Sequence, residues 1–70
     1  MWFLLFIKAC RKYQFTYSLY SYCYLRLDLM PINTFEHIKV KEDCYCYNKN
    51  YNKLFRKAIK IMKEYRNNNK

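Results

Sequence analysis

Cysteine and histidine, the side chains that bind soft metals and act as nucleophile and base, occur five times in this 70-residue chain. They are Cys10, Cys23, His37, Cys44 and Cys46. A single residue separates Cys44 from Cys46, whereas common zinc sites use cysteine pairs separated by two to four residues and closely spaced histidines. We therefore interpret the cysteines as reduced structural residues. The sequence predicts no metal site and no cofactor.

The segment around the single histidine also holds the side-chain types of a nucleophile, a base and an orienting carboxylate. Glu36 precedes His37, and Asp43 and Cys44 follow a few residues later. Such groups catalyse a reaction only when a rigid scaffold brings them together beside oxyanion donors. No pattern indicates that scaffold, and a chain without glycine has no glycine-rich phosphate loop. We expect no enzymatic activity and no small-molecule substrate.

The basic C-terminal segment is the strongest candidate for a binding site. Placed on an α-helix, its apolar residues gather within an arc of about 160°. These apolar residues are Leu54, Phe55, Ala58, Ile59, Ile61, Met62 and Tyr65. The other side carries the cations Lys53, Arg56, Lys57, Lys60 and Lys63. The pattern predicts an amphipathic helix of about fourteen residues, capped by Asn50 or Asn52 and ended by the asparagines from Asn67 to Asn69.

Such a helix fits two classes of anionic partner. At an anionic membrane surface, each cation contributes about 1 kcal/mol, and the apolar face enters the lipid interface. On a nucleic acid, the cations neutralise phosphates independently of sequence, and the apolar face packs against the rest of the chain. Our leading hypothesis is peripheral membrane association, and the alternative is non-specific nucleic-acid binding. A third arrangement leaves the cations as a solvated surface without a partner.

Aromatic residues in the N-terminal half suggest a further nucleic-acid surface. The residues are Tyr13, Phe15, Tyr17, Tyr20, Tyr22 and Tyr24. On a sheet they could stack nucleobases, with Arg11, Lys12 and Arg26 at the phosphates. Trp2 and the tyrosines also suit a membrane interface. The ordinary interpretation is that these aromatics fill a core.

The composition favours an AT-rich coding region. Phe, Tyr, Met, Ile, Asn and Lys, whose codons are rich in A and T, supply 39 of the 70 residues, and glycine is absent. Aromatic content and positive charge are then partly products of base composition. A further hypothesis follows, namely that a short reading frame or truncated remnant encodes this chain without a selected function. Without glycine, asparagine is the residue expected at positions with a positive φ angle. The asparagines placed where turns and helix caps could use them are Asn48, Asn50, Asn52 and Asn67.

The elements that position these residues follow from periodicity. From Tyr13 to Leu29, apolar residues alternate with two one-residue shifts, which predicts strands broken by bulges or a turn. A helical stripe also fits this stretch. Pro31 marks a boundary. Beyond it, Ile38 and Val40 alternate with lysines, as in a protected edge strand, while Asn33 could instead cap a short helix starting at Thr34.

The apolar run from Trp2 to Ile7 bears on membrane insertion. Lys8 follows this run instead of preceding it, which is the wrong order for a signal peptide. A transmembrane helix needs about 20 apolar residues, and Lys8, Arg11 and Lys12 interrupt every such window near the N-terminus. We expect neither a signal peptide nor a full-length transmembrane helix, and we favour an intracellular location.

Together these patterns predict a small single α+β domain over residues 1–66, followed by a disordered polar tail at 67–70. Aromatic N-terminal strands would pack with the C-terminal amphipathic helix. The alternative is an all-α fold. Most of the net charge of +9 lies in the C-terminal third of the chain, so an anionic partner would meet that end.

Overall fold

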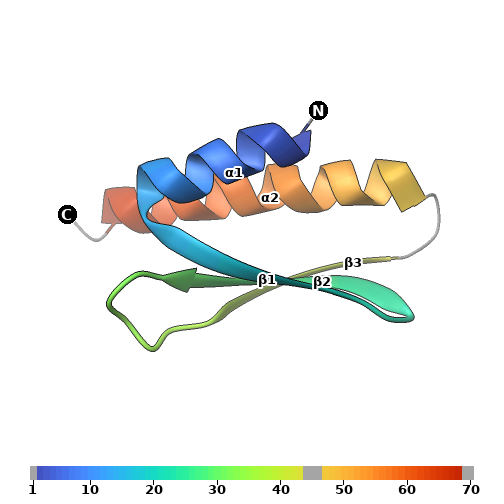
Figure 1. Cartoon of the computed structure of the whole chain (residues 1–70), viewed down its shortest axis with the longest axis horizontal. Helices are drawn as coiled ribbons and strands as arrows, with labels where there is room; N and C mark the ends of the chain where they lie inside the picture. Colours follow the sequence, from blue (N-terminus) through green and yellow to red (C-terminus); the bar gives the residue numbers. More distant parts are fainter. Residues whose placement is uncertain (1, 44–46, 69–70) are drawn as a thin grey trace.

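The computed structural model describes residues 2–43 and 47–68. In chain order the elements are α1 (Trp2–Tyr13), β1 (Phe15–Ser21), β2 (Tyr24–Pro31), β3 (Ile38–Asp43) and α2 (Tyr47–Asn68). The strands form one antiparallel sheet in the order β1-β2-β3. Both helices cover the same face of this sheet (Figure 1). The arrangement confirms the predicted α+β class and excludes the all-α alternative.

One face of the sheet is apolar and lies against the helices. Tyr17 of β1 pairs with Leu29 of β2, and Leu29 pairs with Ile38 of β3. Because directly opposed residues point to the same face, such rows form apolar bands beneath the helices. The two shifts in alternation, after Leu19 and after Tyr24, lie on either side of the turn at Tyr22 and Cys23 between β1 and β2. The prediction of strands in this stretch is therefore confirmed.

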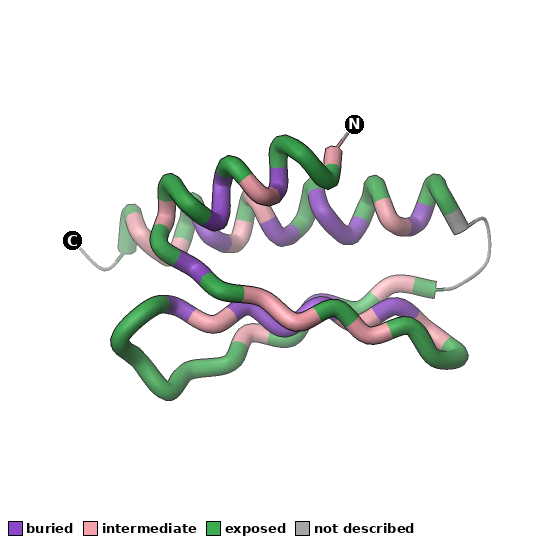
Figure 2. The backbone as a smooth tube through the Cα atoms, in the orientation of Figure 1, coloured by how far each residue is buried: buried purple, intermediate pink, exposed green. Residues whose placement is uncertain are grey.

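The core lies between the sheet and the two helices (Figure 2). Its buried apolar residues are Phe6, Ala9, Cys10, Phe15, Leu25, Leu27, Leu29, Val40, Leu54, Phe55, Ala58 and Met62. The ring centre of Phe6 lies 5.0 Å from those of both Tyr17 and Phe55. The aromatic side chains thus join α1, the sheet and α2 in one cluster.

The N-terminal helix α1 is an element that the sequence analysis did not predict. Its buried residues Phe6, Ala9 and Cys10 have the i, i+3, i+4 spacing of an amphipathic helix. That signal was hidden because Trp2 to Ile7 is apolar on every side. In the fold, α1 lies beside α2 and runs in the same direction (Figure 1), with the Phe3 ring 5.3 Å from that of Phe55.

Two of the described residues adopt a left-handed backbone conformation. Gln14 has φ 61° and Asn33 has φ 70°. Gln14 turns the chain from α1 into β1, and its carbonyl oxygen accepts a hydrogen bond of 2.9 Å from the Ile32 amide. Asparagine tolerates this region better than glutamine. The prediction that turns or caps with positive φ angles form at Asn48, Asn50, Asn52 and Asn67 is wrong, because all four residues lie within α2.

The C-terminal helix is longer than the sequence predicted. It has 22 residues and begins at Tyr47. Asn50 lies inside the helix and not at its cap, and its Nδ2 donates a hydrogen bond of 2.6 Å to the carbonyl oxygen of Asp43. This contact joins the first turn of α2 to the end of β3. The helix also includes Asn67 and Asn68, the first two residues of the expected tail, and residues 69–70 lie outside the described part.

The segment after Pro31 contains the expected edge strand. β3 lies at one edge of the sheet, and Lys39 and Lys41 are exposed along it. The alternative of a helix beginning at Thr34 is wrong, because no helix or strand forms between the end of β2 at Pro31 and the start of β3 at Ile38. Instead, the Thr34 Oγ1 accepts a hydrogen bond of 3.3 Å from the amide of Glu36.

Candidate anion-binding surface

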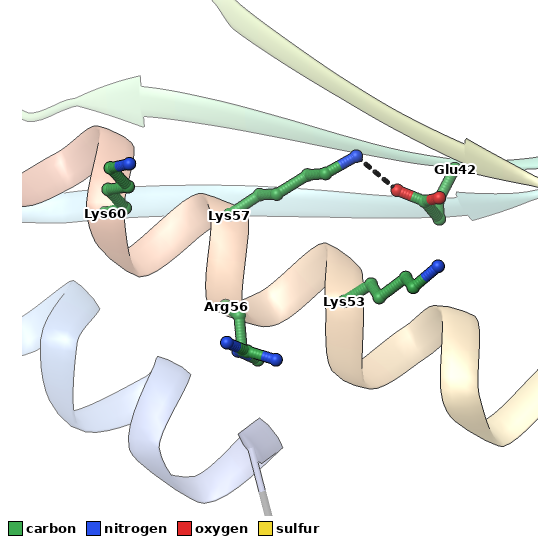
Figure 3. A pocket seen from close by; sticks show the side chains of 5 residues that line it. All are labelled: Glu42, Lys53, Arg56, Lys57 and Lys60. Carbon is green, nitrogen blue, oxygen red and sulfur yellow. Dashed lines mark hydrogen bonds and ion pairs between the residues drawn. The ribbon is translucent and has the colours of Figure 1, made fainter.

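The basic side of α2 borders an open hollow of about 370 Å³ beside β3. Four of the five predicted cations line it, and Figure 3 shows their side chains together with that of Glu42. The lining residues are Glu42, Lys53, Arg56, Lys57 and Lys60. Lys63 is exposed on the same helix but does not line the hollow. The predicted cationic face is thus solvent-accessible along its length.

Glu42 neutralises one of these cations. It lies on the helix-facing side of β3, and its Oε2 accepts a hydrogen bond from the Lys57 Nζ in an ion pair (Figure 3). Its side chain is largely buried, whereas the Lys57 side chain is about half exposed. Sequence analysis missed this pair because its members are far apart in the sequence. The hollow therefore carries an excess of three positive charges.

The groove between the two helices joins cations to apolar side chains. The Arg56 guanidinium lies 5.3 Å from the centre of the Trp2 ring, within reach of a cation–π interaction. A second hollow, of about 290 Å³, lies along α1 and is bordered by Ile59 of α2. Its lining residues are Trp2, Leu5, Lys8, Ala9, Lys12, Tyr13 and Ile59. The outer surface of the helical layer is therefore amphipathic and not purely basic.

The first turn of α1 exposes three large apolar side chains. Leu4 is 63% exposed, Leu5 is 49% exposed and Phe3 is 39% exposed. Lys8 follows Leu4 by one helical turn, so the two side chains lie on the same side of α1. Consecutive exposed apolar residues of this size are unusual for a solvated helix and mark contact surfaces. The sequence signal was the apolar run before Lys8, which periodicity could not divide into buried and exposed sides.

The charges of the molecule are separated between its two layers. α1 and α2 contain ten of the fourteen lysines and arginines but only Glu64 among the five acidic residues. The outward face of the sheet mixes Arg26, Lys39 and Lys41 with Asp28 and Asp43. Charges of one sign over a surface attract an extended anion through their summed potential. The helical layer is thus the candidate anion-binding surface.

The predicted apolar face of α2 is occupied within the fold. Leu54, Phe55, Ala58 and Met62 belong to the buried core, and Ile59, Ile61 and Tyr65 pack against it partly buried. Burial also raises the pKa of Tyr65, with a further contribution from its hydrogen bond to Glu36. These side chains contact the chain's own residues, so a partner at the folded surface meets the cations and not this stripe.

The fold separates the aromatic residues that the sequence grouped as a base-stacking surface. Phe15 is buried on the helix-facing side of the sheet, and Tyr17 packs against Phe6. Tyr20, Tyr22 and Tyr24 lie at the other end, around the β1–β2 turn, where their rings pack in sequence. Of the six aromatic residues, these three are grouped at one end of the sheet, whereas Tyr13 belongs to α1.

The metal-ligating and nucleophilic residues do not form a site within the described part of the chain. There, no group of three His, Cys, Asp or Glu side chains is placed to hold a metal ion. Cys10 is buried in α1 and Cys23 is exposed at the β1–β2 turn. Cys44 and Cys46 lie outside the described residues. Neither described helix combines the length and the apolar character that membrane crossing requires.

Comparisons with known proteins give no relative from which a function could be transferred. No family model, no curated protein and no solved structure matches the chain.

Proposed function

We propose that this protein associates peripherally with anionic membrane surfaces through its helical layer. The observation that carries the proposal is the exposure of Leu4 and Leu5 on α1, where Leu5 lines a hollow together with Lys8 and Lys12. Cations near an anionic leaflet contribute about 1 kcal/mol each. Burial of each half-exposed leucine in the interface adds roughly 1 kcal/mol at about 25 cal/mol per Å². Charge and apolar contact together give reversible binding of the kind that amphipathic surfaces make.

The apolar contact comes from α1 and not from the stripe of α2. Insertion of Leu54, Phe55 or Met62 into lipid would require α2 to leave the sheet and expose the core. Leu4 and Leu5 reach lipid without any such change. The cations of α2, among them Arg56 and Lys60, then face the headgroups from the neighbouring helix.

The test is co-sedimentation with vesicles of phosphatidylcholine containing phosphatidylserine, compared with phosphatidylcholine alone. Wild-type protein should sediment with the anionic vesicles at low ionic strength and be released as salt rises. The double variant Leu4→Ser/Leu5→Ser should bind about thirtyfold more weakly, since roughly 2 kcal/mol is lost. The matched control is Ile32→Ser/Phe35→Ser, which removes two exposed apolar side chains from the β2–β3 loop.

Circular dichroism of each variant separates loss of binding from loss of fold. Unchanged vesicle binding by folded Leu4→Ser/Leu5→Ser protein would overturn the proposal. Binding to duplex DNA provides the contrast, because phosphate contacts use the cations alone. A duplex affinity unaffected by Leu4→Ser/Leu5→Ser, alongside lost vesicle binding, is the pattern expected for lipid contact by these leucines.

A further inference from the structure

The outward face of the sheet carries a second surface, which is independent of the helical layer. Tyr20 of β1, Arg26 of β2 and Lys41 of β3 lie directly opposite one another in the paired strands. Opposed residues share a face, and this row alternates with the helix-facing row of Leu19, Leu27 and Val40. No described helix covers this side of the sheet (Figure 1).

Cationic side chains lie against aromatic rings on this surface. The Arg26 guanidinium lies 4.5 Å from the ring centre of Tyr20, and the Lys41 Nζ lies 5.4 Å from that of Tyr24. The rings of Tyr20 and Tyr22 are nearly parallel, with 6.0 Å between centres and an angle of 12°. Tyr22, in the turn, is 63% exposed. We name Tyr20, Tyr22, Tyr24, Arg26 and Lys41 the tyrosine hairpin.

Asp28 fixes the geometry of the tyrosine hairpin. Its carboxylate accepts a hydrogen bond of 3.1 Å from Arg26 Nη2, and the Arg26 Nε lies 3.1 Å from its other oxygen. Desolvation lowers the pKa of Arg26, but charge attraction and hydrogen bonding from Asp28 and Tyr24 together outweigh it and raise the pKa overall. Arg26 is thus held over Tyr20 as a support. Lys41 and Lys39 remain at the edge strand as exposed cations, close enough to meet a phosphate backbone.

We propose that the tyrosine hairpin binds single-stranded nucleic acid. An unpaired base stacks on the exposed ring of Tyr22, which Tyr20 supports from below, and Lys39 and Lys41 contact the phosphates along the edge of the sheet. Stacking on an aromatic side chain suits any base, since every base has a π-face. Sheets with outward-facing aromatic side chains bind unpaired bases in this manner, whereas duplexes bury the faces of their bases. Among the described residues, the tyrosine hairpin contains no exposed aliphatic side chain comparable to Leu4 and Leu5, which distinguishes it from the helical layer.

Affinity for a polyanion does not by itself distinguish binding at the tyrosine hairpin from binding at the helical layer, because the cations of the helical layer attract any polyanion. The experiment therefore compares a fluorescent oligo(dT) strand with an abasic strand of the same length and charge. Helix-layer contacts with phosphate contribute equally to both affinities and cancel in their ratio. Wild-type protein should bind the oligo(dT) strand about tenfold more tightly, in line with the stacking of one or two bases.

Two variants test whether the ratio of the affinities for the two strands depends on the tyrosine hairpin. Tyr22→Ala removes an exposed ring at the turn and should bring the ratio close to one, with little change in affinity for the abasic strand. Lys41→Gln should weaken binding of both strands together. The matched control Leu4→Ser/Leu5→Ser should leave the ratio unchanged. Equal wild-type affinity for the two strands, or a full ratio retained by folded Tyr22→Ala protein, would overturn the proposal.

This site stands apart from the proposed membrane function. Loss of vesicle binding by Leu4→Ser/Leu5→Ser protein with a retained base preference would support both proposals as separate surfaces. A base preference that disappears in Leu4→Ser/Leu5→Ser protein while Tyr22→Ala protein keeps it would place the nucleic-acid contact on α1 and refute the hairpin.

Discussion

Arg66, near the end of α2, donates a hydrogen bond of 2.6 Å from its Nε to the carbonyl oxygen of Tyr13, the last residue of α1. Its Nη2 donates a second, of 3.0 Å, to the carbonyl oxygen of Gln14. The guanidinium also lies 5.3 Å from the ring centre of Phe15. A cation at this position satisfies terminal carbonyls and complements the negative end of the α1 dipole. One side chain thus joins the C-terminal ends of both helices to the start of the sheet.

We expect Arg66→Ala to lower the free energy of unfolding by about 1 to 2 kcal/mol, because two charge-assisted hydrogen bonds are lost. Arg66→Lys should recover part of that loss, since a cation remains near the helix end. Urea denaturation measures the change. Lys63→Ala, an exposed position in the same helix, should alter stability by less than about 0.5 kcal/mol. Equal effects at the two positions would contradict the assigned role of Arg66.

Glycine at the left-handed positions should stabilise the fold. Gln14→Gly relieves a conformation that costs a residue with a side chain roughly 1 to 2 kcal/mol, partly offset by the greater unfolded-state entropy of glycine. A net gain of about 0.5 to 1 kcal/mol is expected, and Asn33→Gly should gain less because asparagine tolerates this conformation. Chemical denaturation provides the measurement. A destabilised Gln14→Gly protein would show that the Gln14 side chain itself stabilises the corner.

Burial of Cys10 in α1 should protect its thiol. Desolvation raises the pKa of Cys10 from 9.0 to about 11, and the thiolate is the reactive form. In a Cys44→Ser/Cys46→Ser background at neutral pH, iodoacetamide should modify the exposed Cys23 and leave Cys10 unmodified until denaturant is added. Peptide mapping by mass spectrometry measures both sites. Rapid modification of Cys10 in folded protein would mean that α1 does not stay docked.

The same shift gives the sign of a pH effect on stability. The folded state holds the Cys10 proton more tightly than the unfolded state, so this group's contribution is complete below about pH 9 and is lost as pH rises through about 11. Cys10→Ala removes the contribution. The free energy of unfolding should therefore fall less steeply with rising pH in the variant than in the wild-type protein. Identical slopes of this free energy against pH above pH 9 would refute the raised pKa of Cys10.

Removal of the Glu42 charge should strengthen the attraction of the helical layer for anions. Glu42→Gln frees Lys57 and adds one positive charge to the hollow, which corresponds to about fivefold tighter binding to phosphatidylserine vesicles at low salt. Stability should change by no more than about 1 kcal/mol, because the Lys57 side chain of the pair is about half exposed to solvent. Asp43→Asn makes the same charge change on the outward face of the sheet and should have a smaller effect. A larger effect from Asp43→Asn would move the lipid contact to that face.

The sequence predicted those elements whose periodicity was unambiguous. Alternation indicated β1 and β2, and Ile38 with Val40 indicated the edge strand. The helical wheel from Leu54 to Tyr65 indicated the middle of α2. The wheel could not find the beginning of α2, because Tyr47 to Asn52 carry tyrosines and asparagines that form no stripe, and Asn50 is held by a tertiary hydrogen bond to Asp43.

The sequence predicted only part of the candidate site, because its other features depend on contacts between distant elements. Cations of α2 are visible as one face of a wheel, but the pairing of Lys57 with Glu42 depends on the approach of two distant elements. Leu4 and Leu5 could not be distinguished from Phe6 by type, because all are apolar. Only the docking of α1 on the sheet makes the first two exposed and the third buried.

Because α1 and α2 lie side by side, the first and last elements of the chain close one core. Contacts such as that between Arg66 and Tyr13 span most of the polypeptide, and closing long loops slows folding. A ribosome-bound chain that has not yet released α2 leaves Leu25, Leu27 and Leu29 without their cover. Cooperative folding of this domain is therefore completed only after α2 has been synthesised.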